Sequence, residues 1–149
     1  MNNPLVEKVE TLLNELVIHT AVLVRETYDE EHFGNACAVY KLGNLVLQFS
    51  RDRGDDFVDF LNPADTSETC TFDDISLLLG WKSLDEMLAE GKRTSFADPP
   101  KGPISMIESL KLIKSHLFLL DRMFSKSELP ETLSRIRSTC KLRCKAFFG

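Results

Sequence analysis

Apolar residues near the start of the chain recur at helical spacing. They are Leu5, Val9, Leu12, Leu13 and Leu16. Because residues three and four apart share one side of an α-helix, this pattern predicts an amphipathic helix over residues 4–18. Pro4 fits the first turn of that helix, where a missing N–H costs nothing.

From residue 20 the pattern changes to that of β-strands separated by short polar turns. The four strand candidates are "TAVLVRETY" (20–28), "ACAVYKL" (36–42), "LVLQFS" (45–50) and "FVDFL" (57–61). Short links between sequential strands predict an antiparallel meander. Gly54 in the turn "DRGD" is free to adopt a positive φ. One face of the sheet is apolar and needs a cover.

The second half of the chain is predicted to be helical. Capping residues predict short helices over 72–79 and 84–90, ending at Gly80 and near Gly91. Apolar residues spaced by three and four predict one long helix over 104–124, and a final helix follows. The Pro-rich stretch "SFADPPKGP" (95–103) is interpreted as a long loop.

Together these elements predict an α+β fold in a single domain, residues 1–149. An N-terminal helix precedes a four-stranded antiparallel meander, and the helical C-terminal half packs on one face of the sheet. The Pro-rich loop 95–103 is the only candidate for an internal boundary.

The charges are distributed unevenly along the chain, although the net charge is only −5. Residues 1–100 hold 8 Lys/Arg and 19 Asp/Glu, a balance of −11, and residues 101–149 hold 10 and 4, a balance of +6. An acidic surface repels nucleic acid and favours a basic protein partner. The alternatives are that the two halves attract each other within the fold, or that the charge only supports solubility.

Nothing in the sequence indicates export or a membrane span. No apolar run approaches the roughly 18 residues that a transmembrane helix needs. The first residues, "MNNPLVEKVE", lack the basic and apolar regions of a signal peptide. We therefore expect a cytoplasmic protein with reduced cysteines and no membrane partner.

The sequence contains no convincing catalytic, cofactor or metal motif. Cys140 and Cys144 lie one helical turn apart without a CxxC pair, and we expect buried thiols rather than a zinc site. No GxSxG, GxGxxG or GxxxxGK motif occurs. His32 alone lies beside carboxylates, in a turn. The basic residues Arg137, Lys141 and Lys145 are interpreted as a solvated helix face.

The most unusual stretch is "QFSRDRGDDFVDF", residues 48–60. Polar residues in its turn need no special explanation. Asp59, however, lies within a strand, on the face opposite Val58 and Phe60. We predict a partner-binding surface in which an acidic rim surrounds an aromatic anchor. Its residues are Asp52, Asp55, Asp56, Phe57 and Asp59, with Glu30 and Glu31 as secondary candidates. The alternative is that Asp59 pairs internally with Arg51.

A longer stretch resembles a known group of proteins. "HFGNACAVYKLGNLVLQFSRDRGDDFVDF", followed by a short helix ending in "LLLG", is similar to immunity proteins of bacterial polymorphic-toxin and contact-dependent growth inhibition systems. The likeness covers about residues 20–80. It implies a non-enzymatic inhibitor that binds the active domain of its cognate toxin, and it carries over no individual binding residue.

The functional prediction is a protein that neutralises a basic toxin domain, such as a nuclease, through acidic side chains. We expect such a protein to have no enzymatic activity, no cofactor, no metal and no nucleic-acid partner. Two alternatives stay open. One is a secretion chaperone that masks a segment of its partner, and the other is a small hydrolase that uses His32.

Overall fold

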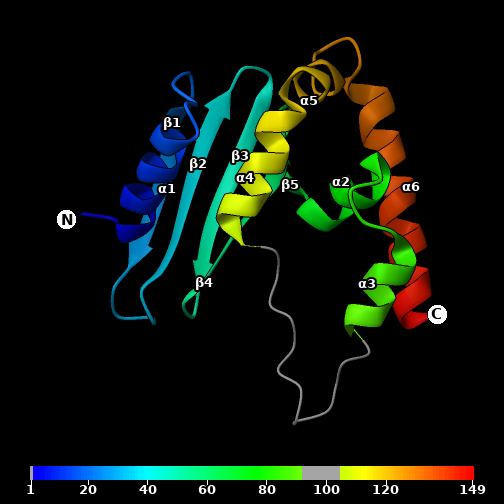
Figure 1. Cartoon of the computed structure of the whole chain (residues 1–149), viewed down its shortest axis with the longest axis horizontal. Helices are drawn as coiled ribbons and strands as arrows, with labels where there is room; N and C mark the ends of the chain where they lie inside the picture. Colours follow the sequence, from blue (N-terminus) through cyan, green and yellow to red (C-terminus); the bar gives the residue numbers. More distant parts are fainter. Residues whose placement is uncertain (1, 92–104) are drawn as a thin grey trace.

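The computed structural model describes residues 2–91 and 105–149, and one helix precedes a sheet that is followed by further helices (Figure 1). The first elements are α1 (Pro4–Glu15), β1 (Val22–Asp29), β2 (Asn35–Leu42), β3 (Leu45–Asp52), β4 (Asp55–Asn62) and β5 (Asp65–Cys70). The later helices are α2 (Phe72–Leu79), α3 (Leu84–Gly91), α4 (Met106–Ser115), α5 (Leu117–Met123) and α6 (Leu129–Phe148). The predicted loop 95–103, and with it the candidate boundary, lies outside the described residues.

The strands form one antiparallel sheet in the order β1-β2-β3-β4-β5. This confirms the α+β class and the meander, but the predicted number of four strands is wrong. The fifth strand, "DTSETC", lacks alternating apolar residues, so its sequence pattern does not predict a strand. It becomes one by pairing with β4, which places Cys70 opposite Phe60. Pairing with a neighbouring strand overrides a weak local preference.

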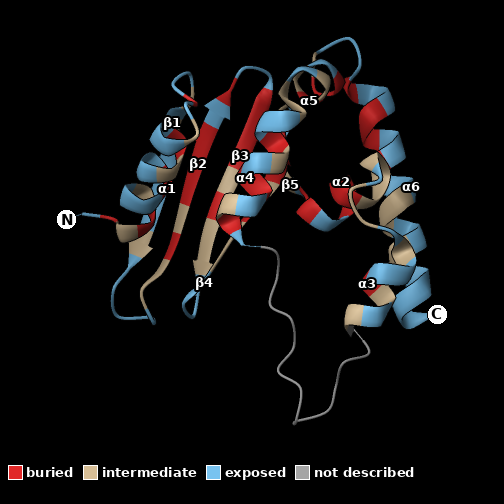
Figure 2. Cartoon of the chain, viewed as in Figure 1, coloured by how far each residue is buried: buried red, intermediate tan, exposed pale blue. Residues whose placement is uncertain are grey.

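Helices cover one face of the sheet, here called the inner face (Figures 1 and 2). The strands give this core Ala38, Tyr40, Leu45, Leu47, Phe49, Val58 and Phe60, and α1 and α4 give it Leu5, Val9, Leu110 and Ile113. The outer face carries a small separate cluster of Val39, Val46 and Leu61. No helix residue in the described part of the chain belongs to that cluster. The outer face of the sheet therefore lies outside the main core.

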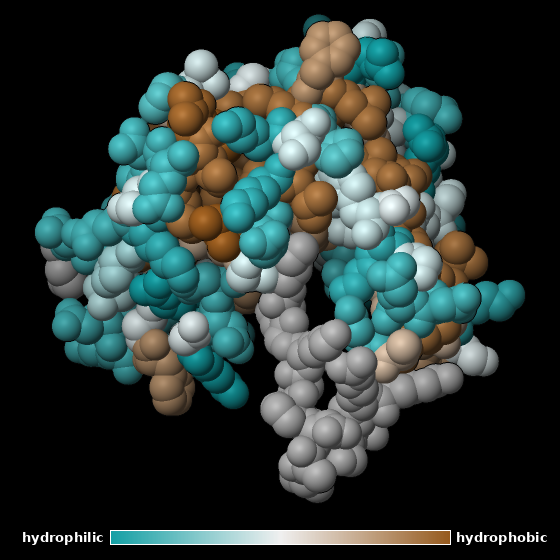
Figure 3. All heavy atoms as spheres, in the orientation of Figure 1, coloured by the Kyte–Doolittle hydropathy of each residue, from teal (hydrophilic) through white to brown (hydrophobic). Residues whose placement is uncertain are grey.

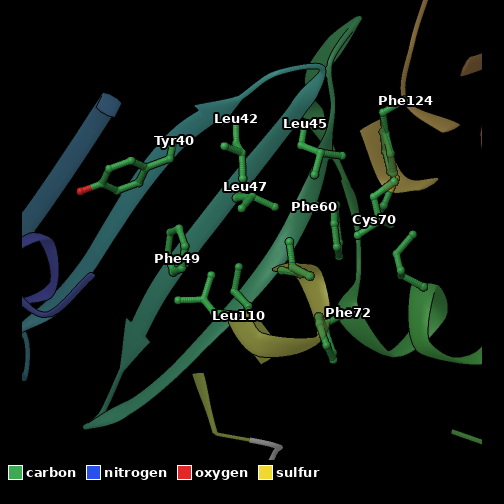
Figure 4. Packing of buried hydrophobic residues seen from close by; sticks show 14 of the residues in the cluster. Tyr40, Leu42, Leu45, Leu47, Phe49, Phe60, Cys70, Phe72, Leu110 and Phe124 are labelled. Atoms are coloured by element: carbon green, nitrogen blue, oxygen red, sulfur yellow. The ribbon is translucent and has the colours of Figure 1, made fainter. Parts of the chain in front are cut away.

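Three aromatic rings join the sheet to the helices on its inner face. Phe60 of β4 stacks against Phe72 of α2 at a centroid distance of 6.3 Å and against Phe124, just after α5, at 5.7 Å. Figure 4 shows Phe60 between the other two rings. Aromatic pairs at these distances contribute beyond their buried area, so this stack fixes where α2 and α5 sit on the sheet.

The helix predicted over 104–124 is two helices, α4 and α5, which are separated at His116. Residue 104 lies outside the described residues. The His116 ring is within hydrogen-bonding distance of the Leu112 carbonyl, 2.9 Å from Nδ1, and packs on the Trp81 ring at 4.9 Å. The backbone of His116 leaves the helical conformation, with φ −116° and ψ 19°, although its N–H still donates to the Leu112 carbonyl at 3.1 Å. The apolar pattern continues through the break because both helices face the same core.

Cap residues define the shorter helices as predicted. Thr71 Oγ1 accepts the backbone N–H of Asp74 at the start of α2, and Gly80 ends that helix with φ 74°. Ser83 Oγ accepts the N–H of Glu86 at the start of α3. These local signals fix helix ends because they satisfy backbone groups that have no partner within the helix.

Helix α1 ends at Glu15, three residues earlier than predicted, in a Schellman motif. The Val17 N–H donates to the Asn14 carbonyl at 3.1 Å, and the Ile18 N–H donates to the Leu13 carbonyl at 2.8 Å. The motif requires a left-handed residue, and Val17 takes that place with φ 59°. A β-branched residue is strained in this conformation.

We expect Val17→Gly to raise the free energy of unfolding by about 1 kcal/mol, because strain of roughly 1–2 kcal/mol is relieved and the greater freedom of unfolded glycine offsets part of the gain. The valine side chain is 64% exposed, so little burial is lost. Urea denaturation followed by circular dichroism measures the change. A less stable variant would show that the side chain stabilises the fold in a way that outweighs its strain.

Candidate functional site

Two hairpin turns lie together at one end of the sheet, the lower end in Figure 1. The first turn, residues 30–34, joins β1 to β2, and the second, residues 53–54, joins β3 to β4. The Arg53 N–H donates to the Asn35 side-chain oxygen at 2.9 Å and so ties the second turn to the first. The two turns consequently present their side chains as one surface.

Left-handed backbone residues shape both turns. Arg53 and Gly54 have φ 53° and 88°, which is typical of the two-residue turns that match the twist of a hairpin. Phe33 and Gly34 have φ 60° and 68° in the other turn. The predicted positive φ of Gly54 is confirmed. Short turns of this kind hold their side chains at the tip, outside the core.

Six side chains form what we call the hairpin-end surface: Glu30, Glu31, Phe33, Asp52, Arg53 and Asp55. All six are exposed, and Phe33 is 75% exposed. The Arg53 guanidinium lies 5.7 Å from the centroid of the Phe33 ring. Within residues 2–91 and 105–149, none of the four carboxylates makes an ion pair. Figure 3 shows mainly hydrophilic side chains at the lower left, where these turns lie.

Asp56 differs from these four carboxylates because its charge is already compensated. Its carboxylate accepts from Arg51 at 2.6 and 2.9 Å and from Lys8 of α1 at 2.7 Å. Its side chain is only 7% exposed. The Arg51 guanidinium, and after it the Lys8 ammonium, hold the pKa of the Asp56 carboxyl below its ordinary value. Asp56 therefore anchors α1 to the base of the hairpin. Its buried, paired carboxylate is poorly placed to contact a binding partner.

Phe57 and Asp59 point to the outer face and are half-buried. The Asp59 carboxylate accepts the Phe72 N–H at 2.7 Å and so caps the start of α2. Burial raises the pKa of Asp59, and the nearby charges of Asp73 and Asp74 raise it further, against the effect of this hydrogen bond. Asp59 is thus an internal capping residue, whereas Phe57 continues the hairpin-end surface onto the outer face.

The alternative pairing of Asp59 with Arg51 is wrong. Strand register places Asp59 opposite Gln48 and Arg51 opposite Asp56. Because side chains alternate between the two faces of a strand, Arg51 lies on the inner face and Asp59 on the outer face.

The basic C-terminal helix compensates carboxylates elsewhere. Arg137 Nη2 donates to both carboxylate oxygens of Glu68 of β5, at 2.9 and 3.1 Å. Arg143 Nε donates to Asp74 of α2 at 2.8 Å. The acidic and basic halves do attract each other at these two contacts, as one of the alternatives proposed. Both contacts tie α6 to β5 and α2, and the four carboxylates of the hairpin-end surface take no part in them.

Cys140 and Cys144 are not the buried core thiols that their spacing predicted. Cys140 is half-buried and Cys144 is exposed. The last buried residue of α6 is Ile136, so the rest of the helix extends past the main core although its apolar spacing continues. In the described part of the chain, no group of three or more His, Cys, Asp or Glu side chains is placed to hold a metal.

Sequence reasoning missed Phe33 and Arg53 as members of this surface. The sequence feature that could have indicated Phe33 is an aromatic residue directly before a glycine in the polar turn "DEEHFGN". His32, in the same turn, contacts Asp29 at 2.7 Å and its side chain is 73% exposed.

None of the helices in the described ranges is long and apolar enough to cross a membrane.

Asp56→Asn is expected to destabilise the protein at neutral pH, because the amide cannot pair with Arg51 and Lys8 as the carboxylate does. A lowered folded-state pKa contributes stability above the ordinary aspartate pKa of about 4, and this is lost as the pH falls through the lowered value. The deficit of the variant should therefore shrink below about pH 4. Urea denaturation at several pH values measures it, and a constant deficit would contradict the ion-pair explanation.

Asp59→Asn should have the opposite effect and stabilise the protein at neutral pH. The amide oxygen can still accept the Phe72 N–H, and no buried charge remains. Because the folded-state pKa is raised, the wild-type protein loses stability as the pH rises through that value. The advantage of the variant should disappear in acid, where Asp59 is protonated. The same denaturation series measures both variants, and a loss of stability at neutral pH would contradict a cost from burial.

No family model, curated protein or solved structure matches this chain. The resemblance of residues 20–80 to immunity proteins therefore stays a prediction. What the chain does must be inferred from the chemistry of its exposed side chains, and the hairpin-end surface is the strongest candidate.

Proposed function

We propose that the chain is a non-enzymatic binding protein of the immunity type, which blocks a basic toxin domain by direct contact through the hairpin-end surface. The observation that carries this proposal is the group of four exposed carboxylates at the same two turns as an exposed aromatic ring. Within the described residues none of the four makes an ion pair. The resemblance of residues 20–80 to immunity proteins supports the same function.

The charge of the surface suits a cationic partner. Glu30 and Glu31 come from one turn and Asp52 and Asp55 from the other, and the single cation among them is Arg53. A concentrated negative surface attracts a basic protein from solution and raises the association rate. A nuclease domain fits this description because it must itself carry positive charge to bind phosphates.

Hydrogen bonding within and between the hairpins orders the backbone of the surface before binding. Each turn closes a hairpin of eight-residue strands, and the hydrogen bond between Arg53 and Asn35 links the two turns. A surface that is ordered before binding loses less conformational entropy on association. An inhibitor with these properties associates quickly and dissociates slowly.

The test is binding to the protein encoded by the adjacent gene, together with protection of growth when both are expressed. The variant combines Glu30→Gln, Glu31→Gln, Asp52→Asn and Asp55→Asn. We expect its association rate to fall by about tenfold at low salt and to depend less on salt. Calorimetry and stopped-flow fluorescence at two salt concentrations measure these changes.

The control removes the same charge from exposed carboxylates on four helices, by Glu15→Gln, Asp73→Asn, Asp85→Asn and Glu131→Gln. It should bind as the wild-type protein does, and thermal unfolding checks that both variants are folded. If the wild-type protein neither binds the adjacent gene product nor protects growth, the proposed function is wrong. Equal losses in the variant and the control would exclude this surface.

A further inference from the structure

We propose that Phe33 is the anchor of the hairpin-end surface and that its partner offers an apolar recess bordered by lysines and arginines. This inference deepens the proposed function and rests on it. The sequence pattern pointed to Phe57 as the aromatic anchor, but Phe57 is half-buried on the outer face, whereas Phe33 stands at the tip of a turn.

Phe33 contributes little to the fold that holds it. Its side chain is 75% exposed and is absent from both hydrophobic clusters of the described chain. Its backbone is left-handed, with φ 60°, a conformation in which glycine or asparagine is less strained. A phenylalanine here exposes an apolar ring to water and strains the backbone, and neither effect stabilises the monomer.

The guanidinium of Arg53 lies over one face of the ring. The Arg53 guanidinium lies 5.7 Å from the ring centroid, and the backbone of Arg53 is bonded to Asn35, two residues after Phe33. One side of the ring is therefore occupied by Arg53 and the rest faces solvent. A large aromatic side chain held in position before binding is typical of interface hot spots.

The charges around Phe33 indicate the chemistry of its partner. Glu30 and Glu31 lie in the same turn, and Asp52 and Asp55 flank the turn of Arg53. When the ring enters an apolar recess, these carboxylates come to lie opposite the border of the recess. Lysines or arginines at that border satisfy them, whereas acidic residues repel them. The partner is therefore a basic protein with an apolar recess within its basic surface.

This division of roles predicts different kinetic effects for the ring and for the carboxylates. Long-range attraction acts before contact, so the carboxylates govern mainly the association rate. Burial of the ring occurs only in the complex, so Phe33 governs mainly the dissociation rate. A surface that bound by charge alone would show no such division.

The experiment compares Phe33→Asn, Phe33→Tyr and the control Phe118→Asn for binding to the adjacent gene product, by stopped-flow fluorescence. Asparagine tolerates left-handed backbone, and Phe118 is a second exposed phenylalanine, at 83%, on α5. We expect Phe33→Asn to raise the dissociation rate by about 30-fold or more while the association rate stays within about threefold. Phe33→Tyr should keep most of the affinity, and Phe118→Asn should bind as the wild-type protein does.

The free energy of unfolding of Phe33→Asn, measured without any partner, provides a second readout. An anchor predicts an unchanged or higher value, and a lower value would overturn the inference because Phe33 would then serve the fold. Binding of Phe33→Asn at wild-type affinity, or an equal loss in Phe118→Asn, would also overturn it. If the wild-type protein itself fails to bind, the proposed function is wrong, and the anchor role is lost with it.

Discussion

The structure depends on how two consecutive residues of β4 hold Phe72, the first residue of α2. The Asp59 carboxylate accepts the Phe72 N–H on one side of the strand, and the Phe60 ring stacks on the Phe72 ring on the other. Strand alternation makes this possible because neighbouring residues point to opposite faces. Phe124 extends the stack, so that one strand fixes both α2 and the end of α5. Burial raises the pKa of the Asp59 carboxyl, and a costly buried charge is tolerated because it sets this junction.

The same arrangement leaves the hairpin turns free. Helices α1 and α4 cover the middle of the inner face, and α6 is tied to β5 and α2 by Glu68 and Asp74. These ion pairs use Arg137 and Arg143 of the basic C-terminal half, and neither pair involves a residue of the hairpin turns. Among the carboxylates of the predicted rim, Asp56 alone pairs with a cation of the described chain, through Lys8 and Arg51. What remains at the end of the sheet is an acidic surface that contains Phe33 and Arg53, and its four carboxylates make no ion pair with any residue that the structure describes.

Stability and binding place different demands on this end of the molecule. Asp56 stabilises the base of the hairpin and is hidden, whereas Phe33 is exposed and strained. Strained or exposed residues that do nothing for the fold are often found where a protein binds. An acidic surface around an aromatic ring suits a basic partner because charge attracts it from a distance and the ring holds it on contact.

Elements with local causes could be predicted from the residues alone. Periodicity and caps gave α1, α2 and α3 to within a few residues, and Gly54 marked the turn between β3 and β4. Features that depend on packing could not be predicted in this way: the fifth strand, the break at His116, and the exposure of Cys144 where α6 passes the core. Packing also sets which aspartates have partners, because Lys8 lies 48 residues from Asp56 and Phe72, whose amide Asp59 caps, lies 13 residues from Asp59. Spacing along the chain reveals which face a side chain occupies, but only packing reveals which group it meets there.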